Sequence, residues 1–171
     1  MRKLWLYLLE LFGFLFLIKF PIEAADKYYS IDNVEIKAEL KTDGSMNVLE
    51  RRKFNFNGSY TFAYEYINKR GQRSQLYDLN NFQVCDENNC YQELDSYKSQ
   101  TYDSSRPESS FYIKKELDKD YLKWFYRAAD EGKTFTIKYT VKNAVTLHND
   151  VAEVYWKFIG KDWEINQKNI N

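Results

Sequence analysis

Soon after the N-terminal region, apolar and charged positions alternate along the chain. The apolar positions are Val34, Ile36, Ala38 and Leu40, and a charged residue follows each of them. A period of two of this kind predicts a half-buried β-strand. Similar stretches recur toward the C-terminus, separated by turn residues. Together they predict an all-β fold, an antiparallel β-sandwich.

The first turn also predicts the register of a hairpin. Thr42-Asp43-Gly44 interrupts the alternation, which resumes at Met46. A two-residue Asp-Gly turn would pair Lys41 with Met46 and mix the two faces. A three-residue loop with Gly44 in the left-handed conformation pairs Leu40 with Met46 and keeps each face uniform, so we expect that loop.

Four aromatic residues follow the period of the next strand, and we expect them to share one face. They are Tyr60, Phe62, Tyr64 and Tyr66. Rings in such a row either pack in a core or stack against sugar rings, and the core is the more common place for them. The row is nevertheless the candidate ligand-binding site of the chain.

Further short strands are expected over 82–85, 90–94, 111–117, 122–126, 135–141 and 152–158. The region 118–133 fits a helix as well as a strand. Strands are favoured there because Asp130-Glu131-Gly132 would make a tight turn between two alternating runs. The stretch 95–110 is rich in Ser and Asp, and we expect a mobile loop.

The N-terminal residues predict export. A basic start, Met1-Arg2-Lys3, precedes an apolar run from Leu4 to Ile18 and the small residues Ala24-Ala25. This order is typical of a secretory signal, here with cleavage after Ala24. The run is shorter than the ~20 residues that span a bilayer, so a cleaved signal is favoured over an uncleaved anchor. We expect a helical signal peptide, residues 1–24, and one extracytoplasmic β domain, residues 25–171.

Charge and composition narrow the choice of partner. The 25 basic residues balance the 25 acidic ones, and no basic block stands out. A nucleic-acid partner is therefore not expected. The aromatic content of 18% comes mostly from Tyr and Phe, which favour strands.

Cys85 and Cys90 are the two cysteines of the sequence, and four polar residues separate them. We expect a hairpin that places the two thiols opposite each other, close enough to bridge. A disulfide is favoured over a reactive dithiol because the chain is exported. With one His and no further Cys, structural zinc is not expected.

Glu50 is the acidic residue of greatest interest. The phase of the first hairpin places Glu50 and Arg52 on the inner face, before Phe54. A buried carboxylate needs a partner. A bulge that turns Glu50 outward, or a structural pair with Arg52, is favoured over a functional site such as that of a carboxylate-based hydrolase.

No catalytic residue or cofactor is predicted. A triad would require His148, the one histidine, and the surrounding sequence, His148-Asn149-Asp150, is typical of a turn. No nucleophile elbow or phosphate loop is present. The acidic loop 86–89 lacks the ligand spacing of a dedicated calcium site.

Two stretches carry a resemblance to a known family. Residues 130–139 and residues 149–163 resemble the YciQ-like predicted membrane proteins of bacteria (DUF2207), a family of unknown function. The second stretch holds Tyr155, Trp156, Gly160 and Trp163. The hairpin with Asp43, Gly44 and Glu50 is similar to the family's first hairpin.

The resemblance implies an extracytoplasmic β domain behind a signal peptide, with no established catalytic residues. It also implies that relatives continue with more strands and then membrane helices. We therefore expect a truncated or short secreted form with an unpaired sheet edge, which would invite a partner strand. Within the second stretch, Gly160 should break the last strand so that Trp163 folds back on Trp156 as a core clamp.

The sequence thus predicts a non-enzymatic module of a cell-envelope protein, exported and either extracellular or tethered to the membrane. It would act through contacts with a membrane or envelope protein, or as a structural ectodomain. Glycan or cell-wall binding through the row from Tyr60 to Tyr66 is the alternative.

Overall fold

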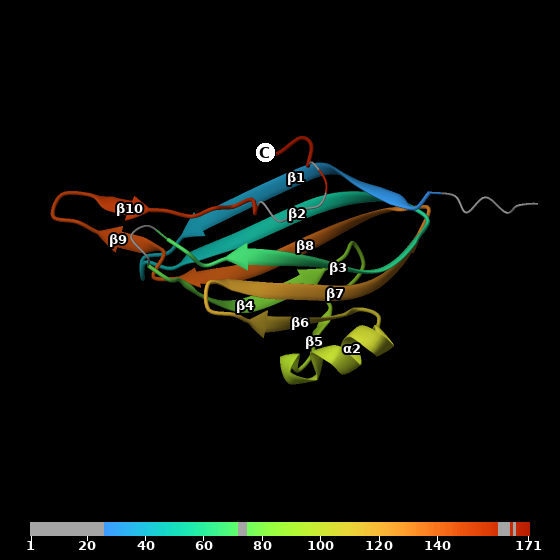
Figure 1. Ribbon diagram of the computed structural model, residues 1–171. Coiled ribbons are helices and arrows are strands. Elements are labelled where there is room, and N and C mark those ends of the chain that lie inside the picture. Colours follow the sequence, from blue (N-terminus) through green and yellow to red (C-terminus); the bar gives the residue numbers. More distant parts are fainter. Residues whose placement is uncertain (1–25, 72–74, 161–164, 166) are drawn as a thin grey trace, which may run out of the picture.

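The structure, a computed structural model, describes residues 26–71, 75–160, 165 and 167–171. Two four-stranded sheets pack face to face as a β-sandwich, which confirms the predicted fold class (Figure 1). The predicted signal peptide lies outside the described residues.

The first sheet has the strand order β1-β2-β8-β4, and the second has the order β3-β7-β6-β5. The first contains β1 (Tyr28–Leu40), β2 (Met46–Asn57), β8 (Gly132–Lys142) and β4 (Asp78–Cys85). The second contains β3 (Ser59–Asn68), β7 (Lys119–Ala129), β6 (Ser110–Lys115) and β5 (Gln92–Glu93). A small ribbon of β9 (Val145–Leu147) and β10 (Ala152–Val154) projects from one end (Figure 1).

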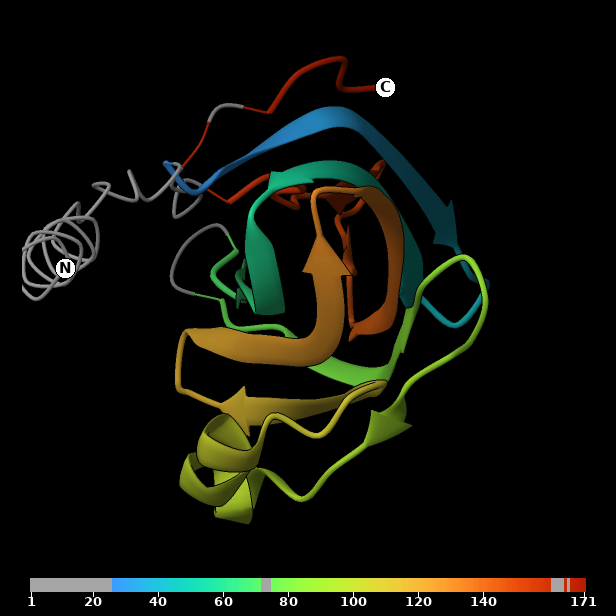
Figure 2. The same cartoon turned by 90° about the vertical axis from the view of Figure 1, so that its right-hand side faces the viewer.

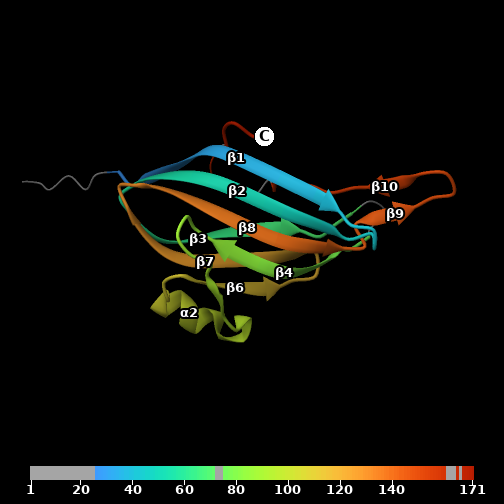
Figure 3. The same cartoon turned by 180° about the vertical axis from the view of Figure 1, so that it is seen from behind.

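Two short turns connect the sheets at the other end of the sandwich, one from β2 to β3 and one from β7 to β8. Gly58, with φ of +87°, joins β2 to β3, and Asp130 begins the turn from β7 to β8. The Gly58 amide donates to Asp130 Oδ1 over 2.6 Å, so the two turns brace each other. Figure 2 looks at this end and shows the first sheet curving over the second; Figure 3 shows β4 beside β8.

The predicted register of the first hairpin is confirmed. Leu40 pairs with Met46, and Gly44 has φ of +79°. Ala38 and Leu40 pair with the buried residues Val48 and Met46 and so lie on the predicted side, but their expected burial is wrong, because the end of β1 extends beyond the core and both side chains are exposed. An irregularity between Ile31 and Asn33 also shifts the phase of β1.

The core between the sheets is unusually aromatic. Its largest buried rings belong to Phe54 and Phe135 from the first sheet and to Trp124 and Tyr126 from the second. The ring centroids of Tyr126 and Phe135 lie 4.7 Å apart, across the gap between the sheets. Aromatic pairs in this range stabilise a fold beyond the area they bury.

Two expected features of the C-terminal half differ from the structure. The stretch 95–110, expected to be a mobile loop, holds a 3₁₀ turn (Ser96–Lys98) and the helix α2 (Ser99–Ser105). The last strand ends at Val154 rather than continuing to Phe158. The chain instead turns there and packs Trp156 against Tyr77, with ring centroids 5.5 Å apart.

The outer edge of β1 is partly covered. Residues 167–171 run parallel to it, and the amides of Val34 and Ile36 donate to the carbonyls of Asn169 and Asn171 over 3.2 and 3.0 Å. The expectation of an unpaired edge is therefore wrong along this part of β1. It stays a prediction for the rest of that strand.

Candidate functional site

Glu50 and Arg52 lie inside the sandwich, neighbours on the inner side of β2 with 1% exposure each. Arg52 Nη2 is 2.5 Å from Glu50 Oε2, so the predicted ion pair is confirmed. The hydroxyl of Tyr139 on β8 donates to the other oxygen of Glu50 over 2.6 Å. Both carboxylate oxygens therefore have a partner inside the core.

Arg52 also reaches across to the second sheet, where it meets an acid that sequence reasoning missed. Its two terminal nitrogens donate to both oxygens of Glu65 on β3, over 3.2 and 3.0 Å. This bidentate geometry ties the two sheets together. We call Glu50, Arg52, Glu65 and Tyr139 the buried charge cluster.

The buried charge cluster has two carboxylates for one guanidinium. Burial raises the pKa of Glu65 to about 8, against the opposing attraction of Arg52 and with further repulsion from Glu50. Burial and the neighbouring Glu50 also raise the pKa of Tyr139 well above its ordinary value. The cluster therefore keeps a proton at neutral pH, but its acids are at most 4% exposed, so no substrate reaches them.

The aromatic row of β3 divides at a shift in register between Tyr60 and Phe62. Tyr60 turns inward and packs against Phe56 in a tilted arrangement, with ring centroids 4.8 Å apart. Phe62, Tyr64 and Tyr66 lie on the outer side of the second sheet and are half-buried. The prediction of one shared face is therefore wrong for Tyr60, and the core interpretation is wrong for the other three.

A ring from the next strand completes this surface. Tyr121 on β7 pairs with Tyr66, and their ring centroids are 5.0 Å apart. The Tyr64 ring lies 5.7 Å from the Tyr121 ring. We call Phe62, Tyr64, Tyr66 and Tyr121 the outer aromatic face. Tyr121 was missed because the predicted apolar face of this strand consists of Leu122, Trp124 and Tyr126, and Tyr121 lies on the opposite side.

Two ammonium groups cover rings of the outer aromatic face. Lys119 Nζ lies 3.8 Å from the centroid of the Tyr66 ring, and Lys123 Nζ lies 4.1 Å from that of Phe62. Cation–π contacts of this length are attractive and hold the ammonium group over the ring. A sugar that stacked on these ring faces would have to displace the ammonium groups.

The helix α2 covers the neighbouring part of the second sheet. Tyr112 on β6 donates to Asp103 Oδ1 over 3.0 Å, and Lys123 Nζ lies 2.8 Å from the same oxygen. Tyr112 and Lys123 are consequently buried, whereas the outer aromatic face beside them stays half-exposed. The helix thus forms one wall of the outer aromatic face.

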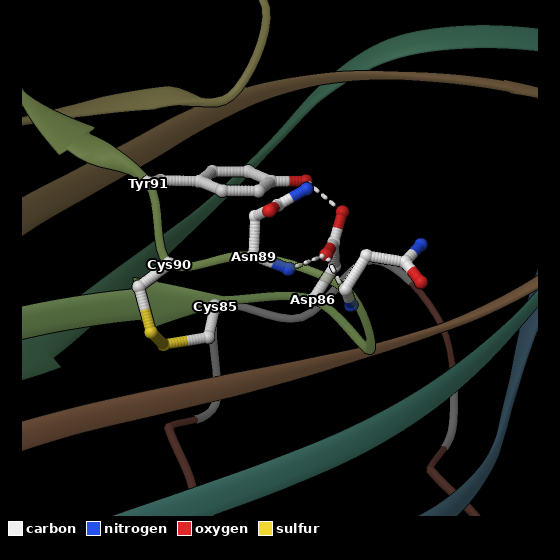
Figure 4. The surroundings of a disulfide bond; sticks show 6 residues. Cys85, Asp86, Asn89, Cys90 and Tyr91 are labelled. Atoms are coloured by element: carbon white, nitrogen blue, oxygen red, sulfur yellow. Dashed lines mark hydrogen bonds between the residues drawn. A yellow bond between two sulfur atoms is a disulfide. The ribbon is translucent and has the colours of Figure 1, made fainter.

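The predicted disulfide is confirmed, since the sulfurs of Cys85 and Cys90 are 2.07 Å apart (Figure 4). The loop between them is held by Asp86, which accepts the amides of Asn88 and Asn89 over 2.8 Å each. Tyr91 donates its hydroxyl to Asp86 over 3.0 Å. All of these contacts serve the loop itself, so the site is structural.

The other residues singled out in the sequence do not converge. Asp43 accepts a hydrogen bond from the Ser45 amide within the turn of the first hairpin. Tyr155 is 47% exposed, and Trp156 is half-buried. The prediction that Gly160 breaks the last strand is wrong, because β10 already ends at Val154. The predicted contact of Trp163 with Trp156 falls outside the described residues.

Among the residues that the structure describes, His148 and the acidic side chains are candidates for catalytic or metal-binding groups. His148 contacts Glu153 over 3.2 Å, and both side chains are substantially exposed. Over residues 26–71, 75–160, 165 and 167–171, no three His, Cys, Asp or Glu side chains are placed to hold a metal ion. Within these same residues, no helix has the length and apolarity to cross a membrane.

The comparisons with known proteins identify the family. The profile of the N-terminal domain of DUF2207, a predicted membrane protein, matches residues 30–171. The chain belongs to this family. The match confirms the resemblance seen in the sequence. No curated protein matches the chain. In this chain the DUF2207 domain is thus a β-sandwich with a charge cluster buried between its sheets and half-exposed rings on the outer side of the second sheet.

Proposed function

We propose that this DUF2207 domain is a non-enzymatic, extracytoplasmic recognition module of an envelope membrane protein, and that it binds a protein through the outer aromatic face. The observation that carries the proposal is the half-exposed set of four rings beside Lys119 and Lys123. Tyrosine is enriched in the centre of protein interfaces because its ring offers large contact area with little side-chain entropy to lose.

Catalysis receives less support from the same residues. Two carboxylates, Glu50 and Glu65, share Arg52 inside the core and are at most 4% exposed. A hydrolase of the carboxylate type needs its acid and base on either side of a bond that the substrate brings in. The buried charge cluster is better explained as a link between the sheets.

The proposal is tested by recovering the partner from solubilised envelopes of the source cell with purified protein as bait. Serine at both Tyr66 and Tyr121 should reduce recovery of the partner at least about tenfold, as expected when hot-spot rings are lost. Serine at Tyr28 and Tyr97, which are 62% and 92% exposed, is the matched control and should not change recovery. Equal recovery by both variants would contradict the proposal.

Sedimentation with purified cell wall distinguishes glycan binding from protein binding. The protein-binding proposal predicts no more sedimentation of the natural chain than of a Tyr64→Ala variant. If a sugar stacked on the Tyr64 ring, loss of that ring would lower sedimentation with the cell wall. Sedimentation that depends on Tyr64 would instead favour the glycan alternative.

A further inference from the structure

A cleft of about 350 Å³ opens between the two sheets at the end where β2 turns into β3. This end faces the viewer in Figure 2. The volume lies at the lower end of the roughly 300–1,000 Å³ range of small-molecule sites. Strands from both sheets contribute to its lining, so the cleft enters the core rather than lying on one face.

Seven aromatic residues line the cleft: Tyr29, Phe54, Phe56, Tyr60, Phe62, Tyr64 and Tyr126. Phe54, Phe56 and Tyr126 are buried and make the floor, while Tyr29 and Tyr60 are half-buried and stand at the mouth. The Tyr29 and Tyr60 ring centroids are 5.7 Å apart. The walls are therefore apolar and suit an alkyl or aromatic group.

The rim of the cleft is positively charged. Lys27 Nζ lies 4.1 Å from the centroid of the Tyr60 ring, and Arg106 Cζ lies 5.2 Å from that of Phe62. Both cations are exposed, and among the described lining residues neither Asp nor Glu accompanies them. An apolar interior with two cations and no acidic residue among its lining complements a ligand with an apolar chain and an anionic head.

We propose that this cleft binds a single-chain anionic amphiphile of the fatty-acid class, with its alkyl chain among the rings and its head group between Lys27 and Arg106. Membership in a predicted membrane protein family places such molecules within reach of the domain.

The cleft and the outer aromatic face share Phe62 and Tyr64 along their border, and they differ in their other residues. Recovery of a protein partner depends on Tyr66 and Tyr121, neither of which lines the cleft. Amphiphile binding depends on Lys27 and Arg106. Each proposal can therefore fail without the other.

Calorimetric titration of purified protein with decanoate tests the site, with decyltrimethylammonium as the probe of equal chain and opposite charge. Decanoate should bind saturably with a stoichiometry of one, and the ammonium compound should bind at least about tenfold more weakly. Glutamate at Lys27 and Arg106 should weaken decanoate binding by about the same factor. Glutamate at Lys53 and Lys138, exposed on the outer side of the first sheet, is the matched control and should leave affinity unchanged.

A cleft-filling variant provides the second test. Ala63 lines the cleft, and Ala63→Leu should abolish decanoate binding while the variant still unfolds cooperatively on heating. Equal affinity for the two probes, or unchanged affinity after the charge reversal at Lys27 and Arg106, would overturn the proposal. Binding to phosphatidylglycerol vesicles with none to decanoate would overturn it as well, because it would indicate surface attraction alone.

Discussion

The two sides of β3 carry opposite kinds of residue in unusual places. Glu65 points inward and is 4% exposed, while its neighbours Tyr64 and Tyr66 point outward and are half-exposed. In most strands the acid would face water and the rings would face the core. The comparison teaches that the charge buried between the sheets serves the fold, whereas the outer rings contribute less to the core and, in our proposal, bind the partner.

Replacing Arg52, at the centre of the buried charge cluster, should have the largest effect on the free energy of unfolding. Arg52→Met leaves Glu50 and Glu65 without their shared cation, and breaking a buried pair in this way costs about 3–5 kcal/mol. Urea unfolding measures the loss in the free energy of unfolding. Arg51→Met, at the next position and exposed on the opposite side of β2, is the control and should change stability by less than about 0.5 kcal/mol.

The pH dependence of stability should isolate Glu65 within the cluster. Its pKa is about 8 in the folded protein and 4.5 for an ordinary glutamate, so between these values the folded state holds a proton that the unfolded state has released. Stability from this group is therefore complete below pH 4.5 and declines as the pH rises toward 8, with a slope of up to about 1.4 kcal/mol per pH unit.

The check is urea unfolding of the natural chain and of Glu65→Gln at pH 5 and pH 8. Raising the pH from 5 to 8 should lower the free energy of unfolding of the natural chain more than that of Glu65→Gln. An identical pH profile for both proteins would mean that Glu65 is ionised in the folded state.

Loss of the disulfide should have an intermediate effect. Closing so short a loop constrains the unfolded chain by about 2 kcal/mol. Serine at both Cys85 and Cys90 should lower the free energy of unfolding by about this amount without changing partner recovery. Dithiothreitol should destabilise the natural chain and leave the double variant unaffected; sensitivity of partner recovery to the reductant would instead point to a functional dithiol.

Substitution on the outer aromatic face should have the smallest effect on stability. Tyr66→Ser removes a half-exposed cross-strand ring contact with Tyr121, and such pairs contribute roughly 0.2–1 kcal/mol. The same substitution should reduce partner recovery strongly. A loss of stability comparable to that of Arg52→Met would show that the ring is a core element, contrary to the comparison drawn above.

Much of the fold could be predicted from the sequence, because alternation and turn chemistry are local properties. The register of the first hairpin follows from the conformation that Gly44 adopts, and the pair of Glu50 with Arg52 follows from their spacing on β2. The tight turn at Asp130 likewise separates β7 from β8.

The candidate site was harder to predict because it depends on contacts between distant strands. On β3 the row of rings alternates with Ala63, Glu65 and Ile67, and either set could face inward. The greater apolar area favoured the rings, but Arg52 from the opposite sheet provides the partner that allows Glu65 to be buried. The helix α2 is similarly held by tertiary contacts of Asp103 that its polar sequence does not reveal.

Photocrosslinking from the outer aromatic face tests the central claim most directly. Benzoylphenylalanine in place of Tyr66, in protein presented to native envelopes, should give a discrete crosslink to one protein. The same probe in place of Lys138, exposed on the outer side of the first sheet, should give none. Crosslinks of equal yield from both positions, or from neither while the protein is folded, would contradict recognition through this face.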